Sequence, residues 1–210
     1  MDSRESVVLV NGLWLGNPAL WLLAWRLRRA GFRTFSFSYP SVRQDLSANA
    51  TQLHAFLDRV PGPTVHLVGY SLGGLVIRAL FRFYPGQRPG RVLLLGSPQQ
   101  GSHAAVALSA SGIGRRLIGR SLADLNAGDP QAWDWPEREI GAIAGNLSLG
   151  LGRFVSRLSG PNDGTVQVSE AVPAAARDRL VLHVSHAGLL FMPVVARQAA
   201  AFLRRGRFAH

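Results

Sequence analysis

Ser71 is the residue of this chain best suited to act as a nucleophile. It stands at the centre of residues 69–73, GYSLG, which match the pattern G-x-S-x-G. A strand-like apolar run, Val65–Val68, precedes it, and a helical pattern, Leu72–Tyr84, follows it. Small residues around a serine permit the tight strand-to-helix turn that lifts its hydroxyl into a site beside helix N–H groups. The pattern predicts acyl chemistry at Ser71, with the Leu72 N–H as one oxyanion donor. The alternative is a glycine-rich turn with an incidental serine.

A serine nucleophile needs a base, and His186 is the histidine whose position fits that role. It lies in the turn directly after the last expected strand, Leu180–Val184. A base has to reach over the sheet edge to the serine, so a loop position suits it better than a strand position. We expect His66, inside a central strand, to be a hydrogen-bonded core residue. The remaining histidines are in a helix, a loop, the last strand and the chain end: His54, His103, His183 and His210.

The base in turn needs an orienting carboxylate, and Asp163 is the candidate. It lies in the turn of residues 160–165, GPNDGT, one strand ahead of the histidine. Asp178 precedes the last strand and so belongs to the opposite end of the sheet. The alternative for Asp163 is an Asp-Gly turn residue that caps its own backbone.

A second oxyanion donor is expected from the loop after the first strand. Residues 11–14, NGLW, follow the apolar run Val7–Val10. A glycine turn in this position can supply a second N–H, here from Leu13. Asn11 and Trp14 are candidates for the substrate pocket. The alternative is an ordinary Asn-Gly turn.

The elements that position these residues alternate between strands and helices. Several strands are continuously apolar, which is typical of strands covered on both faces. The pattern predicts an α/β fold with a mostly parallel six-stranded sheet and helices on both faces, with the functional site at the carboxyl ends of the strands. The expected strands are Val7–Val10, Arg33–Phe37, Val65–Val68, Val92–Leu95, Ile140–Ala144 and Leu180–Val184. The expected helices are Pro18–Ala30, Leu46–Arg59, Leu72–Tyr84, Ala104–Leu125 and Leu189–Arg204.

Composition favours one globular domain spanning residues 1–210. Hydrophobic residues make up 47% of the chain and charged residues 17%, which argues against disorder. The absence of cysteine excludes disulfides, thiolate metal sites and a cysteine nucleophile. We expect no metal and no cofactor, because no metal-spaced cluster, dinucleotide fingerprint or P-loop is found. Residues 102–135 leave room only for a minimal cap, and Trp21 and Trp25 are expected in the core.

The net charge is +11, and all 23 basic residues are arginine. No recognition motif accompanies this charge, so nucleic-acid binding is not expected. Weak association with an anionic surface is compatible with it, and the oligomeric state stays open. The N-terminus lacks the pattern of a signal peptide, and no run is long enough to span a bilayer. The sequence therefore predicts a cytoplasmic protein without stable membrane insertion.

The motifs together resemble those of the α/β-hydrolase superfamily, in particular its compact bacterial lipase and esterase group. The chain order of Ser71, Asp163 and His186 is that of α/β-hydrolases. The resemblance is carried by residues 8–14, 66–74, 96–102, 161–166 and 184–190. It implies Ser71 as nucleophile, Asp163 as acid, His186 as base, Leu13 and Leu72 as oxyanion donors, and a site lined by residues 96–102, including Ser97 and Pro98.

Two positions depart from that family pattern. Asn11 stands where histidine is common, and Tyr70 stands where histidine often precedes the nucleophile. Tyr70 is a further candidate for contact with the substrate. The sequence as a whole predicts a serine carboxylic-ester hydrolase that acts on small acyl esters through an acyl-enzyme. The alternatives are a thioesterase or acyltransferase with the same triad, or a non-catalytic binding protein of this fold.

Overall fold

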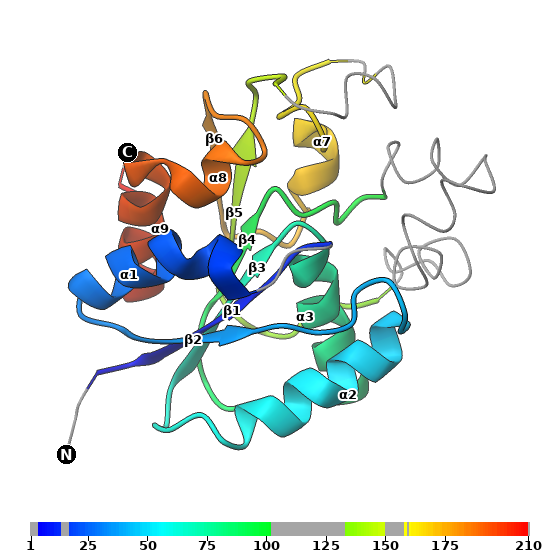
Figure 1. Cartoon of the computed structure of the whole chain (residues 1–210), viewed down its shortest axis with the longest axis vertical. Helices are drawn as coiled ribbons and strands as arrows, with labels where there is room; N and C mark the ends of the chain where they lie inside the picture. The colour runs from blue at the N-terminus through cyan, green and yellow to red at the C-terminus, as the bar shows by residue number, and fades with distance from the viewer. Residues whose placement is uncertain (1–3, 14–16, 102–132, 150–157, 159, 210) are drawn as a thin grey trace.

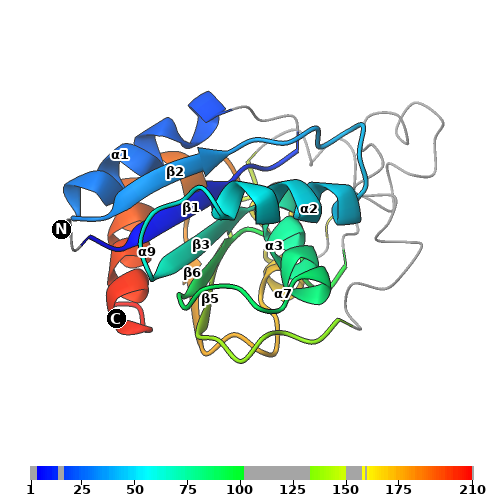
Figure 2. The ribbon, with the colours of Figure 1, turned by 90° about the horizontal axis from the view of Figure 1, so that it is seen from below.

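In the described part of the chain six parallel strands form one sheet, which confirms the predicted six-stranded sheet. The order of the strands is β2-β1-β3-β4-β5-β6. A computed structural model describes residues 4–13, 17–101, 133–149, 158 and 160–209. Figures 1 and 2 show the sheet with helices on both sides. The strands are β1 (Ser6–Val10), β2 (Arg33–Phe37), β3 (Val65–Tyr70), β4 (Val92–Leu95), β5 (Ile140–Gly145) and β6 (Asp178–Leu182).

Two apolar layers hold the helices to the two faces of the sheet. Along β1, Val8 and Val10 pack toward α2 and α3, whereas Val7 and Leu9 pack toward α1 and α9. Burial on both faces is the reason why such a strand is apolar at every position. The helical elements are the 3₁₀ turn η1 (Asn17–Leu20), α1 (Trp21–Arg29), α2 (Leu46–Leu57), α3 (Leu72–Phe83), α7 (Val168–Ala171), α8 (Gly188–Phe191) and α9 (Pro193–Arg205).

Two predicted helices are each divided into two elements in the structure. The first is a 3₁₀ turn followed by α1, so Leu20 and not Asn17 is the residue that precedes the α-helix. The last is divided into α8 and α9 at Met192, which is extended with ψ 132°. Pro193 explains the break, because proline lacks an N–H and keeps the preceding residue out of the helical region.

The last strand begins and ends two residues earlier than the sequence predicts. It runs from Asp178 to Leu182, in register with Gly141–Gly145 of β5. As an edge strand it alternates between exposed and partly buried positions, so its ends are not marked by a continuous apolar run. Val184, expected within the strand, is a buried residue of the following loop.

The prediction that Trp21 and Trp25 are core residues is wrong. Both side chains are exposed on the outer face of α1, Trp21 by 60% and Trp25 by 39%. The inner face of the helix is formed by Leu23, Ala24 and Leu27. Helical spacing alone did not distinguish an inner stripe of small and aliphatic residues from an outer stripe of tryptophans.

Arg78 of α3 joins the loop after β4 to the segment before β5. Its side chain is buried and donates hydrogen bonds to the carbonyl oxygens of Gln99, at 3.0 Å, and of Trp133, at 2.7 and 3.2 Å. Its guanidinium also lies 5.0 Å from the ring centre of Trp135. The predicted helix Ala104–Leu125 and most of the predicted cap lie outside the described residues. None of the described helices has the length and hydropathy needed to cross a membrane.

Candidate active site

Ser71 occupies a strained turn between β3 and α3. Its φ is 52° and its ψ −124°, and it is the sole non-glycine residue with a positive φ in the part of the chain that the structure describes. Such a conformation costs free energy and persists only where the surrounding structure enforces it. The turn presents the serine at the carboxyl end of a central strand and at the N-terminus of a helix, which is the geometry of a nucleophile elbow.

The glycines around Ser71 are required by close packing. A Cβ on Gly69 would lie 2.5 Å from the Cα of Gly74, and one on Gly73 would collide with the Val10 carbonyl oxygen. These contacts press the elbow against the end of β1. The two glycines of the G-x-S-x-G pattern are therefore needed because other backbone segments lie against the chain on both sides of the serine.

His186 and Asp163 lie together at the same edge of the sheet. The His186 Nδ1 is 2.7 Å from the Asp163 Oδ2, and the His186 N–H donates to the Asp163 carbonyl oxygen at 2.8 Å. The other carboxylate oxygen, Oδ1, accepts the N–H groups of Thr165 at 2.9 Å and Val166 at 2.8 Å. Asp163 therefore makes both kinds of contact considered from the sequence, because one oxygen caps its own turn and the other bonds to the histidine, and its role as orienting acid stays a prediction.

This bond fixes the tautomer of the imidazole. A carboxylate accepts a hydrogen bond, so the proton of the neutral ring is on Nδ1 and Nε2 keeps a free lone pair. A ring oriented in this way can take a proton from a hydroxyl through Nε2. The Asp163 side chain is only 1% exposed, so water does not compete for the carboxylate.

The described side chains of Ser71 and His186 make no direct hydrogen bond with each other, and the two are linked through the residues around Ser71. The Ser71 N–H donates to the Leu95 carbonyl oxygen at 2.9 Å. The next residue, Gly96, is so close to the pair that its Cβ would lie 3.1 Å from both the His186 Nδ1 and the Asp163 Oδ2. In unliganded enzymes the bond from nucleophile to base is often long and tightens with substrate.

Tyr70 links the elbow to the histidine. Its ring centre lies 4.9 Å from that of His186, and its hydroxyl donates to the His186 carbonyl oxygen at 3.2 Å. The side chain is 4% exposed. Burial, with a smaller contribution from the charge of Asp163, raises the pKa of the Tyr70 hydroxyl, which therefore remains a donor. Tyr70 thus contacts the histidine and has almost no exposed surface of its own. Its predicted contact with the substrate stays a prediction.

The loop after β1 lies against the elbow. A Cβ on Gly12 would be 3.0 Å from the Tyr70 ring and 3.1 Å from the Ser71 Cβ. Asn11 is fully buried, and its Nδ2 donates to the Phe37 carbonyl oxygen at 3.2 Å and to the Ser38 hydroxyl at 2.9 Å. Asn11 thus anchors the loop from behind and contributes no surface to a pocket. Leu13 is the next residue of this loop, and Leu72 is the first residue of α3. That their N–H groups stabilise an oxyanion stays a prediction. Trp14 lies outside the described residues.

Gly96 belongs to the range 96–102 that the resemblance places at the site, although only Ser97 and Pro98 were named within it. Its φ is +53°, and its Cβ would also lie 2.6 Å from the Leu189 side chain. The sequence does indicate this position, because a glycine directly follows the expected strand Val92–Leu95, which pairs with the strand before Ser71. Its neighbours Ser97 and Pro98, predicted to line the substrate pocket, are both buried, and the Ser97 hydroxyl accepts the Gln99 Nε2 at 2.7 Å. Of these three residues, only Gly96 contacts the histidine and aspartate.

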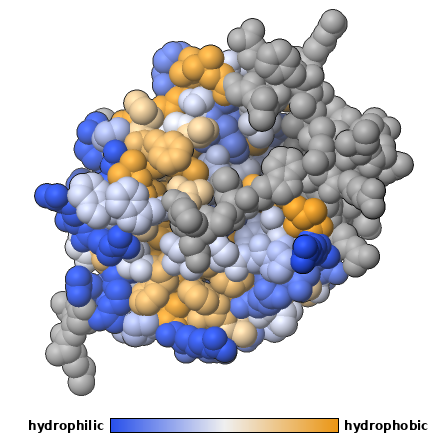
Figure 3. All heavy atoms as spheres, in the orientation of Figure 1, coloured by the Kyte–Doolittle hydropathy of each residue, from blue (hydrophilic) through white to orange (hydrophobic). Residues whose placement is uncertain are grey.

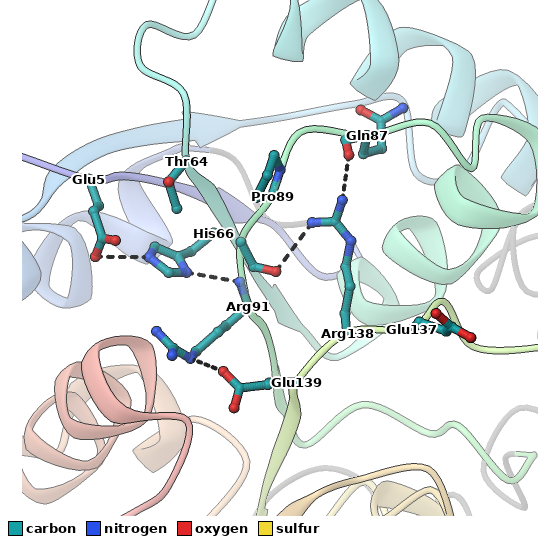
Figure 4. A pocket seen from close by; sticks show the side chains of 10 residues that line it. Glu5, Thr64, His66, Gln87, Pro89, Arg91, Glu137, Arg138 and Glu139 are labelled. Carbon is teal, nitrogen blue, oxygen red and sulfur yellow. Dashed lines mark hydrogen bonds and ion pairs between the residues drawn. The ribbon is translucent and has the colours of Figure 1, made fainter.

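A hollow of about 480 Å³ lies at the opposite edge of the sheet, where the strands begin (Figure 4). His66, a buried core residue as predicted, accepts the Arg91 N–H at 2.9 Å and lies 3.2 Å from the Glu5 carboxylate. Burial lowers its pKa. Arg91 also pairs with Glu139 at 2.5 Å. Arg138 donates to the carbonyl oxygens of Gly90 and Gln87. The hollow is thus lined by hydrogen-bonded and ion-paired side chains at the end of the sheet away from Ser71.

Comparison with known proteins agrees with the fold. The sequence matches the model of the Alpha/beta hydrolase family over residues 7–208. The chain belongs to the alpha/beta hydrolase family. No curated protein matches its sequence.

Solved structures of this fold resemble the chain over nearly its whole length. The lipase BlEst2 of Bacillus licheniformis has a TM-score of 0.76 and 20% identity, covering 97% of this chain and 92% of its own. The esterase EaEST of Exiguobacterium antarcticum has a TM-score of 0.66 and 12% identity, covering 97% and 93%. A bromoperoxidase of Bacillus anthracis has a TM-score of 0.62 and 15% identity, covering 97% and 92%. At these identities the likeness establishes the fold.

Proposed function

We propose that this α/β hydrolase is a serine carboxylic-ester hydrolase with Ser71 as nucleophile, His186 as base and Asp163 as orienting acid. The observation that carries the proposal is the 2.7 Å bond from the His186 Nδ1 to the buried Asp163 carboxylate, next to the strained Ser71. A serine with an oriented neutral imidazole beside it is the combination that acyl transfer requires.

The proposed reaction has two halves. The Ser71 hydroxyl attacks the ester carbonyl while the His186 Nε2 takes its proton, and the developing oxyanion is held by the Leu13 and Leu72 N–H groups. The proton passes to the leaving alcohol, and an acyl-enzyme remains. Water then gives its proton to His186 and attacks the acyl carbon, which releases the acid and restores the serine. Throughout both halves the Asp163 carboxylate stabilises the charged imidazolium.

Some of the similar structures are ester hydrolases, which supports the proposed reaction class. A lipase and an esterase are among them. A bromoperoxidase has the same fold, so the argument rests on the residues of the site. Thioester hydrolysis and acyl transfer remain the alternatives within the same triad, since the leaving group and the acceptor leave no trace in these residues.

The test is hydrolysis of a p-nitrophenyl ester series by the wild type and by Ser71→Ala. We expect turnover by the wild type, and a loss in kcat on the order of 10³-fold or more in the variant, with the residual rate due to binding and oxyanion stabilisation. Ser169→Ala, an exposed serine of α7, is the matched control and should retain full activity. A Ser71→Ala variant that keeps more than a few per cent of the activity would exclude Ser71 as nucleophile. Rates on a thioester panel that exceed those on oxygen esters would favour the thioesterase.

A further inference from the structure

Exposed apolar side chains gather on one surface of the molecule. Seven large apolar side chains are exposed in the part of the chain that the structure describes, and four of them lie on α1, at the end of α8 and in the link to α9. The four are Trp21, Trp25, Phe191 and Met192, which we call the α1–α8 surface. The other three are on separate elements: Phe83, Leu149 and Val181.

The two elements that carry the α1–α8 surface are neighbours. Trp21 and Trp25 are four residues apart and so share one face of α1. The Arg26 guanidinium donates to the Phe191 carbonyl oxygen at 2.6 Å and thereby ties α1 to the end of α8. In Figure 3, apolar surface lies on this side of the molecule over α8, with strongly hydrophilic side chains along the rim beside it. A large exposed apolar patch with a polar rim is typical of a binding surface.

The helices that form and flank this surface are basic. Helices α1, α8 and α9 contain six arginines and no acidic residue. None of the six forms an ion pair within the described ranges. The Arg29 guanidinium lies 5.1 Å from the ring centre of Trp25, so cation and aromatic ring are adjacent. The arginines are Arg26, Arg28, Arg29, Arg197, Arg204 and Arg205.

The surface also adjoins the candidate active site. Helix α8 begins at Gly188, two residues after His186, and the loop of Asn11, Gly12 and Leu13 leads along the chain to η1 and α1. Figure 1 shows α1 and α8 side by side on the same face of the sheet. Anything bound to this surface lies next to the histidine side of the site.

We propose that the α1–α8 surface binds anionic lipid bilayers. Tryptophan and phenylalanine favour the headgroup region of a bilayer, and arginines near the surface are attracted to anionic lipids. Two copies of this chain would bring six arginines of each copy together without an acidic partner, so like-charge repulsion opposes self-association. The inference goes beyond ester hydrolysis and does not depend on it, because lipid binding requires neither Ser71 nor turnover.

The test is co-sedimentation of the Ser71→Ala protein with phosphatidylcholine vesicles that contain about 30% phosphatidylglycerol, and with pure phosphatidylcholine vesicles as a reference. We expect binding to the anionic vesicles that weakens about tenfold or more between roughly 0.05 and 0.5 M salt. Trp21→Gln with Phe191→Gln should lower the partition coefficient by about tenfold, since two aromatic anchors are removed. Phe83→Gln is the matched control, because Phe83 is 47% exposed and Phe191 49%, on opposite faces of the sheet.

Each result decides the proposal. It is supported if the double variant loses binding while Phe83→Gln binds within about twofold of the parent protein. It is overturned if the parent protein does not bind anionic vesicles, or if both variants bind equally. It is also overturned if light scattering shows a dimer that Phe191→Gln dissociates, because the surface would then bind a second copy. Circular dichroism of each variant identifies loss of folding, and in that case Phe191→Gln alone is measured.

Discussion

Asp163 serves two purposes with its two oxygens, and this division makes its contribution measurable. Oδ1 accepts two backbone N–H groups of its own turn, and Oδ2 meets the His186 Nδ1. An amide in place of the carboxylate can preserve the first set of bonds. It cannot preserve the second, because an NH₂ group in the place of Oδ2 is a donor.

Asp163→Asn should therefore leave the fold intact and disable the base. The amide would force the His186 proton onto Nε2, where it blocks proton transfer from Ser71. We expect kcat on a soluble ester to fall by about 10³- to 10⁴-fold, with KM changed little. Asp178→Asn, at the opposite end of the sheet, is the control. A loss of less than about tenfold would show that Asp163 does not orient the base.

Tyr70 acts on His186 through its ring and hydroxyl. Tyr70→Phe retains the ring contact and removes the bond to the His186 carbonyl oxygen. One neutral hydrogen bond contributes about 1 kcal/mol, so we expect kcat to fall by roughly fivefold with KM unchanged. Steady-state kinetics separates the two constants. A change confined to KM would assign Tyr70 to substrate binding, as the sequence analysis first suggested.

For single residues, the sequence predicts at which end of the sheet they lie but not which distant side chains they contact. Ser71, Asp163 and His186 could be found because each follows a strand whose carboxyl end faces the same edge. The ring contact of Tyr70 with His186 joins residues 116 positions apart. Nothing in the pattern around either residue indicates that contact. The burial of Ser97 and Asn11 likewise depends on packing between loops.

At the scale of elements, the sheet was predictable and the helix limits were not. Continuous apolar runs marked the buried strands, whereas the edge strand β6 alternates and was misplaced by two residues. Pro193 divides α8 from α9, although the apolar pattern runs on through it. The end of β4 touches both parts of the site, because the Leu95 carbonyl oxygen accepts the Ser71 N–H and Gly96 approaches His186 and Asp163.

Gly96→Ala should damage both stability and catalysis. Its φ of +53° is unfavourable for alanine, and the new Cβ would meet Leu189, Asp163 and His186. We expect a loss of about 1–3 kcal/mol in the free energy of unfolding and a fall in kcat of about tenfold or more, measured by denaturant titration and ester kinetics.

Gly160→Ala is the matched control for this prediction. Its φ is +81°, and no atom of the described residues lies within 4 Å of the added Cβ. Both variants therefore place alanine at a positive φ, but only the Cβ of Gly96→Ala collides with His186 and Asp163. Equal losses of activity in the two variants would show that strain, and not contact with the histidine and aspartate, is responsible.

At the scale of the whole molecule, the two ends of the sheet have different roles. The carboxyl ends hold the proposed catalytic residues, and the amino ends hold the ion pairs around His66. Burial lowers the pKa of His66, against the weaker opposing effect of Glu5. The unfolded chain then takes up a proton near the ordinary pKa of about 6.5 that the folded chain does not.

The free energy of unfolding should consequently fall as the pH is lowered below about 6.5, and should be insensitive to His66 above that pH. His66→Asn keeps an acceptor for the Arg91 N–H and removes the titrating ring. We expect this variant to be less stable at neutral pH, with a shallower decline in acid, in denaturant titrations from pH 8 to 5. A decline as steep as that of the wild type would mean that other groups cause it.

The central claim is that Ser71 is a nucleophile activated by His186, and covalent labelling tests it most directly. The protein is treated with a fluorophosphonate, and the modified peptide is identified by mass spectrometry. The account predicts one adduct, on Ser71, with a labelling rate that falls by at least about 10²-fold in His186→Ala. An unlabelled protein, an adduct on another residue, or equal labelling of His186→Ala would contradict it.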